Sequence, residues 1–169
     1  MPTPARLDAV IDRMRRTREY TRQYLPDLTP EEWFWSPPSY TTHIAWQVAH
    51  VAVSQYNLCL RRLRGRNADD EALVSENFIN AFKIGSQPIA GSKANPPLAE
   101  IQRVFDAVHH QILTELPLVD DAELDAPSEP QHPRFKTKLG GIDYASQHEL
   151  VHAGQIAMLR RLMGKVPLR

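Results

Sequence analysis

The sequence predicts an all-α fold, a four-helix bundle, from three observations. Four segments carry apolar residues with the 3.6-residue period of a helix that faces a core. No segment shows the sustained two-residue alternation of a half-buried strand. The 14 prolines cluster between the four segments, where they separate helices. With 169 residues, the chain is long enough for a single domain, residues 1–169, with its own core.

The first two helices have clear boundary signals. The first is expected over Pro4–Leu25, with Thr3 as its N-cap and proline at its first position, and Pro26 ends it. The second is expected over Thr42–Arg64 and ends at Gly65, which suits the C-cap conformation. Three arginines lie near that end of the helix: Arg61, Arg62 and Arg64. Their positive charges complement the negative end of the helix dipole, and this interpretation is favoured over an anion-binding site.

The last two helices are separated from their neighbours by long connections. The third helix is expected over Pro97–Leu116 and the fourth over Gly141–Met163. Single helical turns are expected at Pro30–Phe34 and Asp120–Leu124. The connections on either side of the third helix, of roughly 30 and 20 residues, exceed the usual length and favour crossover loops or segments that line a pocket.

Composition narrows the functional classes. The formal net charge is zero, so nothing indicates a nucleic-acid or anionic-membrane partner. The longest apolar run, IAWQVAHVAV, is too short to span a bilayer. The single cysteine, Cys59, cannot form an internal disulfide and is expected in the core, and the N-terminus lacks the apolar segment of a signal peptide. A cytoplasmic location is expected.

The fourth helix contains the pattern H-E-x-x-H, formed by His148, Glu149 and His152. The two histidines lie about 40° apart on one helix face. The residues of this helix within about 80° of His148 include Gln155 and five apolar residues; the apolar ones are Val151, Ile156, Leu159, Leu162 and Met163. This predicts that the histidine pair lies on the core side of the helix and that Glu149 lies outside it. Unsatisfied imidazoles there would cost about 1 to 3 kcal/mol each, so a shared cation is favoured over a hydrogen-bonded pair.

A third ligand has to come from another helix. His50 is the leading candidate, because catalytic zinc-like sites generally take three protein ligands. Its neighbours form a narrow polar stripe of the kind that most often faces water, so the pattern alone leaves its role open; the stripe comprises His43, Gln47, His50, Ser54 and Arg61. His109 borders the apolar face of the third helix and is less favoured. His110 points away, and His132 lies in a proline-rich loop.

The same five-residue pattern occurs in zinc proteases, where the glutamate is the general base. Those enzymes take their third ligand from further along the chain. This sequence has Gln155 and Met158 where the extended protease pattern needs glycine and histidine, and no acidic residue follows Glu149. The sequence therefore disfavours a protease.

Two segments carry a resemblance to a known family: LTPEEWFWSPPSYTTHIAWQVAHVAVSQYNLCLRRLRG and YASQHELVHAGQIAMLRRLMG. They resemble the DinB-like superfamily of four-helix-bundle metal proteins. The resemblance implies one metal-binding histidine in the second helix and two in the fourth, which match His50, His148 and His152. It implies a divalent metal, zinc or nickel first. Glu149 has no required place in the family pattern and is expected to be solvated rather than a general base.

The resemblance also implies an activity, because relatives include S-transferases that use low-molecular-weight thiols such as bacillithiol or mycothiol. The expected function is metal-dependent activation of such a thiol for transfer to a small electrophilic substrate, in a pocket near Trp46, Gln47 and Gln155. Two alternatives stay open. One is a hydrolase that uses water whose pKa the ion lowers to about 7, and the other is a non-enzymatic, stress-related metal-binding bundle. A homodimer is expected.

Overall fold

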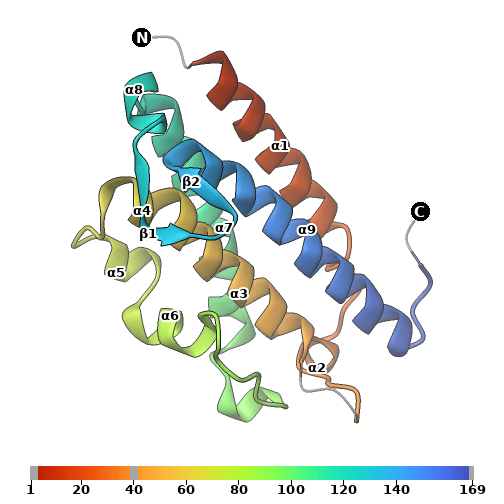
Figure 1. The fold of residues 1–169 in the computed structure, drawn as a ribbon. Coiled ribbons are helices and arrows are strands. Elements are labelled where there is room, and N and C mark those ends of the chain that lie inside the picture. Colours follow the sequence, from red (N-terminus) through yellow and green to blue (C-terminus); the bar gives the residue numbers. More distant parts are fainter. Residues whose placement is uncertain (1–3, 39–41, 168–169) are drawn as a thin grey trace.

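The structure, a computed structural model, describes residues 4–38 and 42–167 and is mostly helical (Figure 1). The predicted all-α bundle is confirmed. Its long helices are α1 (Ala5–Arg22), α3 (Ile44–Tyr56), α7 (Leu98–Glu115) and α9 (Lys138–Leu162). Helix α3 packs against both α7 and α9, and α1 packs against α9. Among the described helices, none combines the length and apolarity needed to cross a membrane.

Short elements fill the connections between the long helices. The two predicted single turns are present, as α2 and α8. Other elements were not predicted, and they divide the long connection before α7 into ordered pieces. In chain order the short helices are α2 (Pro30–Trp33), α4 (Arg62–Arg64), α5 (Asp70–Leu73), α6 (Glu76–Phe82), the 3₁₀ turn Ser92–Ala94, the 3₁₀ turn Leu116–Leu118 and α8 (Asp121–Leu124).

The second predicted helix is not one continuous α-helix. After α3 the chain makes a π-helical segment, Asn57–Arg61, and then the short α4. The predicted C-cap Gly65 does end the segment, with a φ of 81°. In the first helix, the predicted N-cap Thr3 lies outside the described residues, and Pro4 is the N-cap of α1.

Two short strands, which the sequence analysis did not foresee, accompany the all-α bundle. Strand β1 (Pro127–His132) pairs antiparallel with β2 (Phe135–Thr137) in a small hairpin beside α9 (Figure 1). Only Ser128 and Phe135 of these strands are buried. The sequence did not predict these strands, because proline lacks a backbone N–H donor and the segment has little alternation of apolar and polar residues.

Helix α9 begins at Lys138, three residues before the predicted start, and its first turns lie against Phe135. A side chain at Gly140 would bring its Cβ to 3.0 Å from Cβ of Phe135, and one at Gly141 would lie 3.1 Å from the Phe135 ring. The two glycines therefore lie inside the first turns of α9, where they let the hairpin approach closely. Thr137 caps the helix by accepting a hydrogen bond from the backbone N–H of Gly140 at 3.2 Å.

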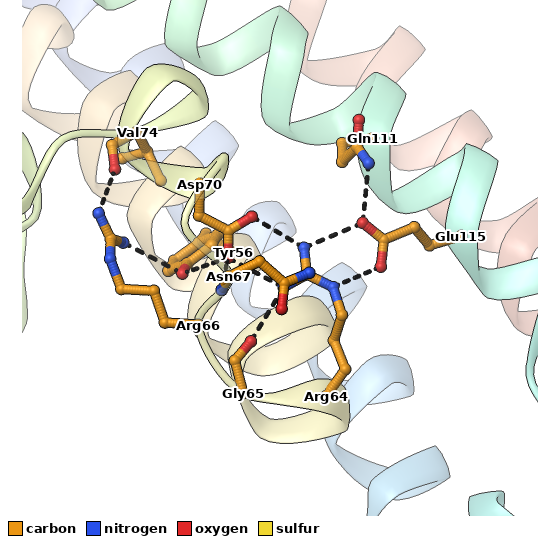
Figure 2. A network of polar contacts seen from close by, with 9 residues as sticks. All are labelled: Tyr56, Arg64, Gly65, Arg66, Asn67, Asp70, Val74, Gln111 and Glu115. Carbon is orange, nitrogen blue, oxygen red and sulfur yellow. Dashed lines mark hydrogen bonds and ion pairs between the residues drawn. The ribbon is translucent and has the colours of Figure 1, made fainter.

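A polar network fixes the end of the second helical segment to α5 and α7 (Figure 2). The guanidinium of Arg64 donates to both carboxylate oxygens of Asp70, each at 2.9 Å, and to both of Glu115, at 2.5 and 2.9 Å. The hydroxyl of Tyr56 donates to Asp70 at 2.9 Å. Arg64 thus joins a short helix, a loop and α7. These contacts show that Arg64 has a structural role and is not a free charge at the helix end.

Replacing Asp70 with asparagine is expected to lower the free energy of unfolding by about 2 kcal/mol at neutral pH, because Arg64 loses a charged partner. The hydrogen bonds from Arg64 lower the pKa of Asp70 to about 2, from an ordinary 3.8. A depressed pKa stabilises the fold above about pH 4 and loses that contribution as the pH falls toward 2.

Urea unfolding of wild type and Asp70→Asn between pH 7 and pH 3 measures this contribution. The difference between the two proteins should be constant from neutral pH to about pH 5 and shrink below about pH 4. Asp69→Asn, at an exposed neighbouring carboxylate, serves as the matched control. A difference that does not change with pH would show that the ion pair is not its source.

Candidate metal centre

Three histidines from two helices meet at one point. His50 comes from α3, and His148 and His152 come from α9. One ring nitrogen of each lies within 4.8 Å of the others. The Nε2 atoms of His148 and His152 are 3.1 Å apart, close to the separation of about 3.3 Å for two nitrogens bound to one tetrahedral ion at about 2.05 Å. The cluster is compatible with metal binding.

His50 is held by groups that fix its tautomer. Its Nδ1–H donates to the carbonyl oxygen of Phe82 at 2.7 Å. Because a carbonyl oxygen only accepts, the proton lies on Nδ1 and the lone pair on Nε2. The indole of Trp46 stacks on the His50 ring, with centroids 4.7 Å apart and planes 7° from parallel. Helix α6, which ends at Phe82, therefore orients an imidazole on α3.

His152 is oriented in the same way by a side-chain amide. The amide nitrogen of Gln47 donates to Oγ1 of Thr42 at 2.8 Å, so its oxygen faces His152 and accepts the Nδ1–H of that ring. The lone pair of His152 then lies on Nε2, toward His148. Outer hydrogen bonds of this kind fix the rings of metal-ligating histidines in other proteins.

The three imidazoles are neutral at pH 7. Burial, with a smaller contribution from the neighbouring histidines, lowers the pKa of His148 to about 4 and that of His152 to about 3. Burial also lowers the pKa of His50, against the opposing effect of its hydrogen bond to Phe82. Imidazole must be neutral to bind a metal ion, so the burial of the cluster prepares its nitrogens for a ligand role.

His50 and His148 open into a cleft of about 790 Å³. Its walls come from α3, the π-helical segment, the residues after α6, the hairpin and α9; they include Ser54, Asn57, Lys83, Ile84, His132 and Tyr144. Among the described residues, no fourth histidine, cysteine or carboxylate joins the three histidines. The cluster thus has three candidate ligands and a solvent-accessible side.

Glu149 corrects the expectation of a solvated residue, because its side chain is fully buried. Its Oε1 accepts from Nε of Arg18 on α1 at 2.8 Å, and its Oε2 accepts from Nε2 of Gln55 at 2.5 Å. Arg18 is also buried and donates to the carbonyl oxygen of Phe105 on α7 at 2.6 Å. Glu149 thus belongs to an ion pair in the core, with each oxygen already accepting a hydrogen bond.

The buried face of α9 is therefore rotated from the predicted one. Glu149 lies about 100° from His148 on the helix, and the buried residues centre near it. They are Gly141, Ile142, Ala145, Ser146, Glu149, His152, Ala153, Ile156, Leu159 and Arg160. Val151 and Leu162, which the sequence interpretation assigned to the core, are exposed. From the sequence this face is assigned to solvent, because Glu149 and Arg160 are charged residues.

The three predicted pocket residues lie in different surroundings. Trp46 and Gln47 contact His50 and His152, as described above, although neither is among the residues that line the cleft. Gln155 is exposed and lies outside the cleft lining.

Three further histidines and the cysteine lie outside the cluster. His132 lines the cleft from the hairpin, stacked on Phe135, and sequence reasoning missed it because the hairpin has little strand signal. Neither His109, which is buried, nor the exposed His110 is part of the cluster. Cys59 is buried as predicted, and burial raises the pKa of its thiol.

Comparison with known proteins adds one match. The family model described as the DinB superfamily matches residues 13–156, which include all three clustered histidines. A comparison with curated proteins found no match.

Proposed function

Because the chain belongs to the DinB superfamily, we propose that it binds a divalent metal ion, zinc or nickel, through His50, His148 and His152. We propose further that it is an enzyme that transfers a low-molecular-weight thiol to a small electrophile. The observation that supports this most directly is the meeting of three imidazoles, two of them oriented by outer hydrogen bonds, beside an open cleft.

The roles of the chain's own residues follow from their contacts. The carbonyl of Phe82 and the amide of Gln47 hold the rings of His50 and His152 with Nε2 toward the common point. Trp46 covers one face of His50 and excludes water from that side. A divalent ion held by three imidazoles would keep a bound thiol as its thiolate, which is the nucleophile.

Two features favour an enzyme with an added thiol over the alternatives. Structural metal sites are usually fully ligated by protein, whereas the described residues supply three candidate ligands here. The single cysteine cannot supply the nucleophile, since Cys59 is fully buried and burial raises its pKa. The thiol therefore has to enter through the cleft. The homodimer and the cytoplasmic location stay predictions.

The test is conjugation of a small thiol to chlorodinitrobenzene by zinc- or nickel-loaded protein. In this reaction a sulfur–carbon bond forms, the carbon–chlorine bond breaks, chloride leaves and the thiol proton passes to solvent. Conjugate should form with loaded protein, stop after chelator treatment and return when metal is added back. Absence of turnover with every thiol in a panel would contradict the proposal, and ester hydrolysis without thiol would favour the hydrolase alternative.

A further inference from the structure

Four cationic side chains line the cleft that His50 and His148 open into. They are Arg61, Arg62, Arg66 and Lys83, and among the described lining residues the single carboxylate is Glu129. The chain as a whole has 20 basic and 20 acidic residues. The positive excess in the cleft is therefore a local feature and does not follow from composition.

Among the described residues, three of these cations have no ion-pair partner. Within the part of the chain that the structure describes, no carboxylate lies within 4.0 Å of Arg61, Arg62 or Lys83. Arg66, in contrast, pairs with Glu71 and Glu76. Neighbouring cations in a partly enclosed cleft repel one another and attract an anion.

The π-helical segment helps to bring Arg62 to the cleft. Arg62 follows His50 by twelve positions, and on an uninterrupted α-helix it would lie about 120° away around the axis. The extra residue of a π-helical turn subtracts about 100°, which leaves Arg62 about 20° from His50. Segments of this kind occur often at functional sites. The predicted continuous helix concealed this rotation.

Arg62 is held in position with donors to spare. Its Nη1 donates to Oγ of Ser128 at 3.2 Å and to the carbonyl oxygen of Pro130, both on β1. Its Nε and Nη2 donate to no group among the described residues. Arg61 beside it is exposed and lines the same cleft. The two side chains can thus present guanidinium donors to one anion.

The spacing of the cations sets the shape of a ligand. Lys83 directly follows Phe82, whose carbonyl oxygen accepts a hydrogen bond from His50, so the backbone of Lys83 lies beside the histidine cluster. The backbone of Arg61 lies about 16 Å from the backbone of His50 along the helix axis. A molecule that reaches both the histidines and the arginines must be elongated.

We propose that the cleft binds an elongated small molecule whose reactive end lies at the three histidines and whose far end carries a carboxylate or phosphate held by Arg61 and Arg62. This inference rests on the proposed function and names the chemistry of the thiol that the metal centre would hold. It replaces the interpretation of these two arginines as helix-end charges alone.

The experiment compares matched thiols on cobalt-substituted protein, where the thiolate-to-cobalt absorption band reports binding rather than turnover. The probes are mercaptohexanoate, mercaptohexyl phosphate and the neutral mercaptohexanamide. At least one anionic thiol should bind about tenfold more tightly than the amide, and the tighter of the two identifies the preferred anion. Arg61→Gln/Arg62→Gln should abolish the preference and leave the affinity for the amide unchanged.

The control is Arg15→Gln/Arg16→Gln, which removes an adjacent arginine pair from the exposed side of α1 and should keep the preference. Equal affinities for charged and neutral thiols, with the absorption band present, would overturn the inference and leave the proposed function standing.

If no thiol produces the band, hexanoate and hexanamide are titrated instead and followed by NMR chemical shifts. A preference for hexanoate that the double variant loses would then support the anion site while the thiol proposal fails. No preference would overturn both.

Discussion

Replacing Glu149 with alanine is expected to lower the free energy of unfolding by about 3 to 5 kcal/mol, because it leaves the guanidinium of Arg18 buried without its carboxylate. Arg18 is 1% exposed, so water cannot take the place of the lost partner. Gln55 would lose an acceptor as well. Urea unfolding followed by circular dichroism measures the loss.

A double variant separates the lost charge from the lost volume. Arg18→Met/Glu149→Leu removes both charges and keeps apolar contact with Phe105, whose ring lies 3.5 Å from the Arg18 guanidinium carbon. It should recover most of the stability, since replacing a whole buried pair with apolar residues is often neutral or stabilising. If Glu149 were a general base, the single variant would instead keep its stability and lose thiol conjugation, the opposite of the expected pattern.

Replacing His50 with alanine is expected to weaken metal binding by more than about 100-fold, because the loss of a ligand should exceed the 10- to 100-fold cost of losing an outer hydrogen bond. Elemental analysis and competition with a chromogenic chelator measure the change. The fold should persist, since His50 lies at the edge of the cleft and α3 keeps its packing against α7 and α9.

His110→Ala is the matched control, because it removes an exposed imidazole from α7. Its metal content should equal that of the wild type. The metal affinity of Gln47→Leu should lie between those of the His50 and His110 variants. It should be about 10- to 100-fold weaker than that of the wild type, because the His152 ring loses the hydrogen bond that orients it. Wild-type metal content in the His50 variant would disprove the three-histidine site.

The long helices could be predicted because their evidence is local. Apolar periodicity and boundary residues place α1, α7 and α9 within a few residues of their observed limits. The pair His148 and His152 is likewise a local pattern, one helical turn apart. Predictions of this kind depend on residues that lie close together in the sequence.

The rest depends on contacts between distant residues. Glu149 meets Arg18 across 131 positions, and Arg160 meets Asp27 across 133. No local pattern therefore reveals that Arg18, Glu149 and Arg160 are buried. His50 appeared to lie on a water-facing stripe, because α6 and its carbonyl partner cannot be foreseen from the sequence of α3. The family resemblance, rather than the helix pattern, identified it.

The order of synthesis gives the histidine cluster a further property. His148 lies 98 positions after His50, on the last long helix. A nascent polypeptide that has not yet emerged from the ribosome past α9 presents one of the three imidazoles. Capture of an ion by all three must therefore follow translation of this region.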